Sequence, residues 1–113
     1  NVVGYVDADW ANEYDRKSVS GFLFEVYGAL VSWCTKKQNI IALSSTESEY
    51  VALCQASCEF LWLNNLLIEM NIEVESPVTM YEDNMSCIHM LSKPGHAKQK
   101  HIVSNHLIHV TYI

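Results

Sequence analysis

A long segment without glycine or proline, residues 44–76, most limits the folds that this chain can adopt. Its first four residues, Ser-Ser-Thr-Glu, match a capping box, in which serine and glutamate side chains satisfy the free N–H groups at a helix start. Apolar residues then recur at spacings of three and four: Leu53, Ala56, Phe60, Leu63, Leu67 and Met70. This spacing predicts one long helix with a single buried stripe.

The position one turn before this stripe is an acid. Stepping back from Leu53 leads to Glu49. In one interpretation, this carboxylate begins the stripe and faces the interior of the fold. In the other, it lies in the first turn, where it favours the helix dipole and caps the helix through Thr46. Both interpretations stay open on this pattern alone.

Short β-rich segments lie on both sides of the helix. Residues 2–7 alternate between two faces and predict a strand that ends at Asp7. A Tyr-Gly turn joins residues 22–26 and 29–34 as a hairpin. The remaining predicted elements are a strand at 78–81, a short helix at 85–91 and a helix from about 101 to 110. The order β-β-β-α-β-α predicts one α/β (or α+β) domain, with a three-stranded antiparallel start, a long helix, and then a parallel strand and helices.

Composition narrows the class of protein. The chain has 113 residues, 50% of them apolar, which suits one globular domain. No apolar run reaches the ~20 residues of a membrane helix, so we expect no membrane partner. The formal charge of −6 argues against a protein that coats nucleic acid, although acids that hold cations add little net charge. Four cysteines without a Cys-x-x-Cys pair indicate a reduced, intracellular protein.

Three acids are expected to meet in this fold. Asp7 ends the first strand, and Asp83 follows the fourth. If these strands are parallel neighbours, the two aspartates lie side by side, and a helix across the sheet can bring Glu49 to them. Carboxylates this close repel one another, a conflict that divalent cations such as Mg²⁺ or Mn²⁺ remove. Two such ions about 4 Å apart can activate water and stabilise the leaving oxygen of a phosphodiester.

Short sequence blocks run in a fixed order through essentially the whole chain. They are residues 4–11 (GYVDADWA), 15–22 (DRKSVSGF), 32–33 (SW) with 37–38 (KQ), 42–53 (ALSSTESEYVAL) continued by 61–63 and 66–67, 81–84 (YEDN) and 100–102 (KHI). In this order and spacing they resemble the ribonuclease H domain of copia-type LTR retrotransposon Pol polyproteins. The strongest match lies in residues 42–53.

The resemblance implies a ribonuclease H-like fold over residues 1–113 and cleavage of the RNA strand of RNA–DNA hybrids during reverse transcription. It implies a two-metal endonuclease that uses Mg²⁺, with Mn²⁺ as an alternative. By motif position, Asp7, Glu49 and Asp83 match the catalytic and metal-binding acids. It also implies a reverse transcriptase domain of the same polyprotein as partner, and a cytoplasmic location in virus-like particles.

Neighbouring acids are expected to point elsewhere. Asp9 shares a strand face with Asp7 but lies about 6.6 Å further along, where it could support the site from outside. Glu47 is turned by about 200° from Glu49 around the helix. Strand alternation turns Glu82 away from Asp83.

The sequence gives a weaker indication of the residues that would contact the hybrid than of the three acids. Asn84 and Ser86, at the start of a helix, could donate to a phosphate. Lys36, Lys37 and Lys100 are candidates for contacts to the nucleic-acid backbone. An ordinary solvated surface explains each of these five residues as well. The three tryptophans are expected in the core rather than stacked on bases.

Two departures from the family pattern leave activity open. Val103 stands where the family has an acid after Lys-His-Ile. Family members also continue into a strand and a helix that supplies a fourth carboxylate. We therefore expect a C-terminally truncated domain without its last strand and helix, whose fourth strand is an exposed edge. The alternative function is a degenerate or domesticated remnant that binds hybrid or a protein partner without cleaving.

Overall fold

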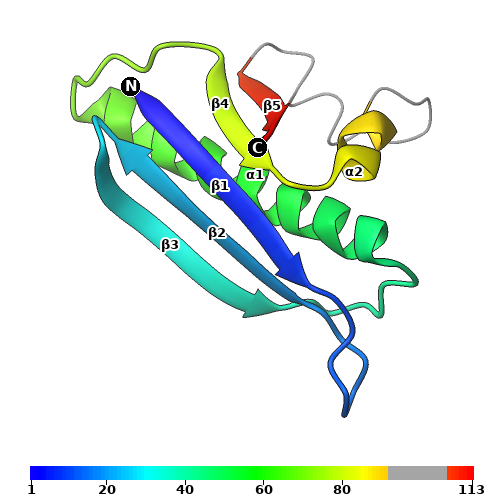
Figure 1. Cartoon of the computed structure of the whole chain (residues 1–113). Helices are drawn as coiled ribbons and strands as arrows, with labels where there is room; N and C mark the ends of the chain where they lie inside the picture. Colours follow the sequence, from blue (N-terminus) through cyan, green and yellow to red (C-terminus); the bar gives the residue numbers. More distant parts are fainter. Residues whose placement is uncertain (92–106) are drawn as a thin grey trace.

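The computed structural model describes residues 1–91 and 107–113 (Figure 1). Within these residues the elements, in chain order, are β1 (Val2–Asp9), β2 (Val19–Val26), β3 (Ala29–Lys37), α1 (Ser45–Glu69), β4 (Val78–Glu82), α2 (Met85–Met90) and β5 (Ile108–Tyr112). The prediction of a mixed α/β fold with an antiparallel start and one long helix is confirmed.

The strands form one mixed sheet in the order β3-β2-β1-β4-β5. β2 pairs antiparallel with both β1 and β3, whereas β4 pairs parallel with both β1 and β5. The parallel pair β1–β4 places Val6 opposite Glu82. Because both strands run toward the same end of the sheet, the residues that follow, Asp7 and Asp83, reach that end together.

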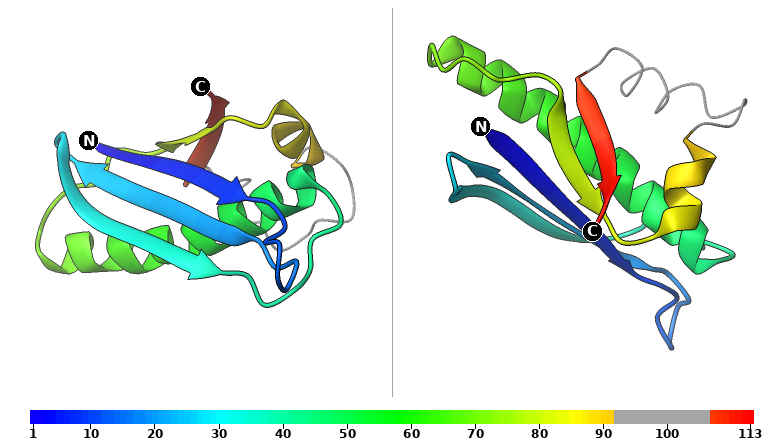
Figure 2. Two further views of the ribbon diagram at one scale, coloured as in Figure 1. Left: turned by 60° about the horizontal axis from the view of Figure 1, so that its bottom comes forward. Right: turned by 45° about the horizontal axis from the view of Figure 1, so that its top comes forward.

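α1 covers one face of the sheet and packs mainly on β1 and β2 (Figure 2). The predicted cap forms, with one difference in its second bond. The Ser44 hydroxyl accepts from the Glu47 N–H at 3.1 Å, and the Glu47 carboxylate accepts at 2.9 Å from the N–H of Leu43, the residue before the N-cap. The predicted stripe is buried from Leu53 to Leu67. Met70, its last predicted member, is 59% exposed, because the helix ends at Glu69 and Met70 is only its C-cap.

The C-terminal prediction was wrong in two respects. A helix was expected over residues 101–110, but residues 108–110 belong to β5, and residues 101–106 lie outside the described part. β5 lies alongside β4, so the last strand is present and β4 is not an exposed edge (Figure 2). Ile108 is buried and His109 exposed, which is the two-residue period of a strand. The predicted absence of a final helix stays a prediction.

The tryptophans were also placed wrongly. Trp10, Trp33 and Trp62 are 47%, 69% and 57% exposed, whereas all three were expected in the core. Trp62 stands next to the apolar stripe of α1 in sequence, but a neighbour in sequence is turned by about 100° around a helix. Trp33 lies on β3, which is the last strand on its side of the sheet.

Length and composition alone would allow α1 to cross a membrane. A core helix meets the same criteria, and α1 has its stripe buried against β1 and β2.

The packing at Gly4 yields a stability prediction. A Cβ added to Gly4 would lie 2.7 Å from Cε1 of Phe24, whose ring is fully buried beneath α1. We expect Gly4→Ala to lower the free energy of unfolding by about 1–3 kcal/mol, measured by urea denaturation. Gly21→Ala is the matched control, because its added Cβ meets nothing closer than 3.9 Å. Equal stabilities of the two variants would contradict this packing.

Candidate metal-binding site

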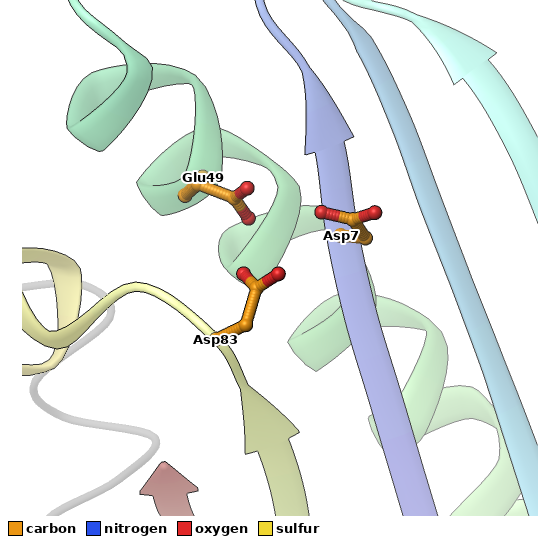
Figure 3. Close-up of side chains that lie close together, drawn as sticks. All are labelled: Asp7, Glu49 and Asp83. Carbon is orange, nitrogen blue, oxygen red and sulfur yellow. The ribbon is translucent and has the colours of Figure 1, made fainter. Parts of the chain in front are cut away.

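Three carboxylates from three separate elements meet at one end of the sheet (Figure 3). Asp7 lies on β1, Glu49 in the first turns of α1, and Asp83 directly after β4. One oxygen of each acid lies within 4.8 Å of the oxygens of the other two. The structure therefore brings together the three acids that the sequence singled out.

Each acid owes its place to a local feature of the chain. The β1–β4 register delivers Asp7 and Asp83 to the same end of the sheet. Ser44 caps α1 and so fixes where the helical turns begin, which puts Glu49 in line with Leu53 and Ala56 on the side that faces the sheet. Glu49 is only 6% exposed, so of the two open interpretations the inward-facing one is correct.

A fourth acid, Glu82, adjoins the three. Its side chain is fully buried, and its Oε1 accepts from the backbone N–H groups of Asp83 at 3.1 Å and Asn84 at 3.2 Å. As strand alternation predicted, Glu82 points to the opposite side from the exposed Asp83. On that side it lies in the protein interior, close to Glu49. Strand alternation indicated only that Glu82 and Asp83 point to opposite faces, and the sequence held no signal that the Glu82 side of the strand is buried.

The site is electrostatically strained without a cation. Burial raises the pKa of Glu49, and the negative charges of Asp7 and Asp83 raise it further, against the lowering effect of a hydrogen bond with Glu82. Burial likewise raises the pKa of Glu82, and Glu49 adds to the effect. Within residues 1–91 and 107–113, Oε2 of each glutamate has no hydrogen-bond donor, and an unpaired buried oxygen is costly inside a protein. A shared proton or a cation would relieve this strain.

The acid cluster has the features of a site for a hard divalent cation. Carboxylate oxygens are the ligands that such ions prefer, and Asp7 and Asp83 are exposed, which leaves an approach from solvent. A cavity of about 370 Å³ adjoins both aspartates on the sheet face opposite α1. Its floor includes Tyr5, Leu23 and Trp33. The three acids could therefore hold a metal ion beside a space open to a ligand.

The other predicted residues take varied places. Asn84 is the N-cap of α2, with its Oδ1 accepting from the Cys87 N–H at 2.8 Å, and Ser86 is exposed in the first turn. Lys36 and Lys37 are exposed at the end of β3, where Lys37 pairs with Asp15. Lys100 lies outside the described residues. The cluster does not include Asp9 or Glu47.

The metal-free chain should lose stability as the pH rises from about 5 to about 9. The raised pKa values of Glu49 and Glu82 mean that the folded chain binds more protons than the unfolded chain in this range, so a higher pH favours unfolding. Thermal unfolding in EDTA measures the effect. The pKa of Asp15 is lowered, so this residue changes the stability of the fold only at more acidic pH.

Two additions sharpen this measurement. Glu82→Gln should flatten the pH dependence, because it removes one of the two titrating groups. Excess Mg²⁺ at high pH should raise the Tm again, because an ion that binds only the folded chain stabilises it. A Tm that is constant or rises with pH in EDTA would contradict the strained cluster.

Comparisons with known proteins bear on the origin of the chain. No protein-family model matches it. It is 43% identical over 102 residues to the retrovirus-related Pol polyprotein from transposon TNT 1-94 of Nicotiana tabacum, and 36% identical over 100 residues to that from transposon RE2 of Arabidopsis thaliana. These matches cover 88% and 87% of this chain but only 8% and 7% of the polyproteins.

A shorter match has a different name. The chain is 56% identical over 63 residues to the secreted RxLR effector protein 161 of Plasmopara viticola, covering 55% of this chain and 44% of that protein. The matches to the polyproteins extend much further along the chain. Over most of its length, the chain is thus homologous to one small part of the retrovirus-related Pol polyproteins of copia-type transposons.

Proposed function

We propose that the chain is the ribonuclease H-like domain of a retrotransposon Pol polyprotein, and that it hydrolyses the RNA strand of RNA–DNA hybrids with two divalent ions, Mg²⁺ or Mn²⁺. The observation that carries the proposal is the meeting of Asp7, Glu49 and Asp83 within 4.8 Å. These are the three motif positions at which the family resemblance puts catalytic acids. Homology to Pol polyproteins over most of the chain supports the same assignment.

The donor set fits divalent cations. All three side chains offer hard carboxylate oxygens, and among the described residues no softer nitrogen or sulfur ligand belongs to the cluster. The negative charges that raise the pKa of Glu49 are the charges that a cation neutralises. Burial on the Glu49 side and exposure on the aspartate side leave room for water and a phosphate where the substrate must enter.

Each of the three acids would bind the ions from a different side of the site. Asp7 and Asp83 would hold the ions at the open end of the sheet, and their separation is fixed because β1 and β4 share a hydrogen-bonded ladder. Glu49 would hold the ions from the buried side, on a helix that packs against both β1 and β2. When bound, the ions supply an activated water and stabilise the leaving oxygen of the phosphodiester.

The hybrid would approach from the exposed side of Asp7 and Asp83. Lys36 pairs with Ser20, which pairs with Ala8, so Lys36 lies two strands from the site, at a distance of about 10 Å in the sheet. Backbone contacts by Lys36, Lys37 and Lys100, with Asn84 and Ser86 near the scissile phosphate, form part of the proposal. So do a reverse transcriptase domain as partner in the same polyprotein and a cytoplasmic location in virus-like particles.

Two observations favour a second function. The 56% identity to a protein named as a secreted effector suggests that related sequences exist outside polyproteins. Val103, at a position where the family has an acid, also fits a domesticated remnant. Such a remnant would use the same surface to bind hybrid or a protein partner without cleaving.

Cleavage of a labelled RNA–DNA hybrid distinguishes the two functions. With Mg²⁺ the chain should cut the RNA strand, and Asp83→Asn should lower the rate more than about 100-fold, because a charge that holds the ions is lost. EDTA should abolish cutting. Glu69→Gln, at the exposed far end of α1, removes the same charge without touching the site and should cut normally.

Two results would count against the nuclease. No cutting by a chain that is folded by circular dichroism would favour the remnant. Cutting that survives Asp83→Asn would mean that the activity belongs to another site or to a contaminant.

A further inference from the structure

We propose that Glu82 is a positioning residue that fixes Asp83 and Asn84 through their backbone N–H groups and so holds the acid cluster in shape for metal binding. The importance of that cluster rests on the proposed function. The positioning itself rests on the geometry of the turn between β4 and α2.

The first observation is where the strand ladder stops. Val6–Glu82 is the last pair between β1 and β4, and Glu82–Tyr112 is the last pair between β4 and β5. The N–H groups of Asp83 and Asn84 therefore lie beyond the sheet and need other acceptors. One oxygen of Glu82 accepts from both, at 3.1 Å and 3.2 Å.

The second observation is that this oxygen cannot easily be replaced by water. Glu82 is fully buried, so the glutamate is the acceptor that the interior offers to these two amides. Removal of a buried acceptor leaves its donors unpaired, at a cost of about 1–3 kcal/mol. The turn is thus held in one orientation by a group that the solvent does not compete for.

The third observation is that both residues of this turn have a structural role next to the acid cluster. Asp83 carries one of the three clustered carboxylates, and Asn84 caps α2 by accepting from the Cys87 N–H at 2.8 Å. The carboxyl group of Glu82 also contacts that of Glu49. Because Glu82 also pairs with Val6 on β1, it touches, through backbone or side chain, the elements that supply all three acids.

Glutamine and methionine separate this role from simple filling of space. Glu82→Gln keeps an oxygen acceptor at Oε1, whereas Glu82→Met has a similar length and no acceptor. We expect Glu82→Gln to bind Mn²⁺ within about 3-fold of the unaltered chain and Glu82→Met to bind it about 10–100-fold more weakly, the usual effect of losing a group that orients a metal ligand. Isothermal calorimetry of the full chain with MnCl₂ measures both affinities.

A second readout needs no metal. In amide hydrogen exchange followed by NMR, the Asp83 and Asn84 N–H groups should be protected in the unaltered chain and in Glu82→Gln, and should exchange faster in Glu82→Met. Leu67→Ala is the control for lost stability, because Leu67 is buried near the far end of α1. It should lower the Tm but leave Mn²⁺ affinity and the protection of both amides unchanged.

The outcomes separate this proposal from the proposed function. Equal Mn²⁺ affinity and equal amide protection in Glu82→Met and the unaltered chain would overturn the role of Glu82, even if the chain cleaves hybrid. Loss of both in Glu82→Met, with rescue by Glu82→Gln, would support that role even if the chain binds Mn²⁺ without cutting. No Mn²⁺ binding by the unaltered chain would overturn both proposals.

Discussion

The parallel pairing of β1 with β4 is the constraint on which the rest of the structure depends. These two strands are far apart in sequence. The chain between them forms β2, β3 and then α1, which crosses the sheet from β3 to β4. A helix in that position must pack on the sheet that it connects, so the same connection that pairs Asp7 with Asp83 also lays Glu49 across them. The acid cluster is thus a direct consequence of the topology.

The cluster works against the stability of the chain that forms it. Glu49 and Glu82 are both buried, and burial raises the pKa of each. Within the described residues, one oxygen of each also lacks a hydrogen-bond donor. Burial of charge without a partner is among the costliest arrangements in a protein. Strongly shifted pKa values are typical of functional sites. In this chain the buried charges lie at the acid cluster, where a bound cation would neutralise them.

Sequence predicted the parts of the fold that local patterns control. Local spacing predicted the cap at Ser44, the stripe from Leu53 to Leu67 and the hairpin before them. The meeting of the three acids followed once β1 and β4 were assumed to be neighbours in the sheet. β5 was missed because a strand of only five residues carries a weak sequence signal. The exposure of the tryptophans and the burial of Glu82 depend on which side of an element meets its neighbour, which spacing alone does not reveal.

The central claim is that Asp7, Glu49 and Asp83 together bind divalent cations. Crystals of the chain grown with MnCl₂ would test it most directly, because Mn²⁺ is located by its anomalous scattering without reference to any assumed activity. We predict an anomalous peak between the three carboxylates, absent from crystals of Asp7→Asn. A chain that is saturated with Mn²⁺ but shows its ions only elsewhere, or none at these acids, would contradict the account.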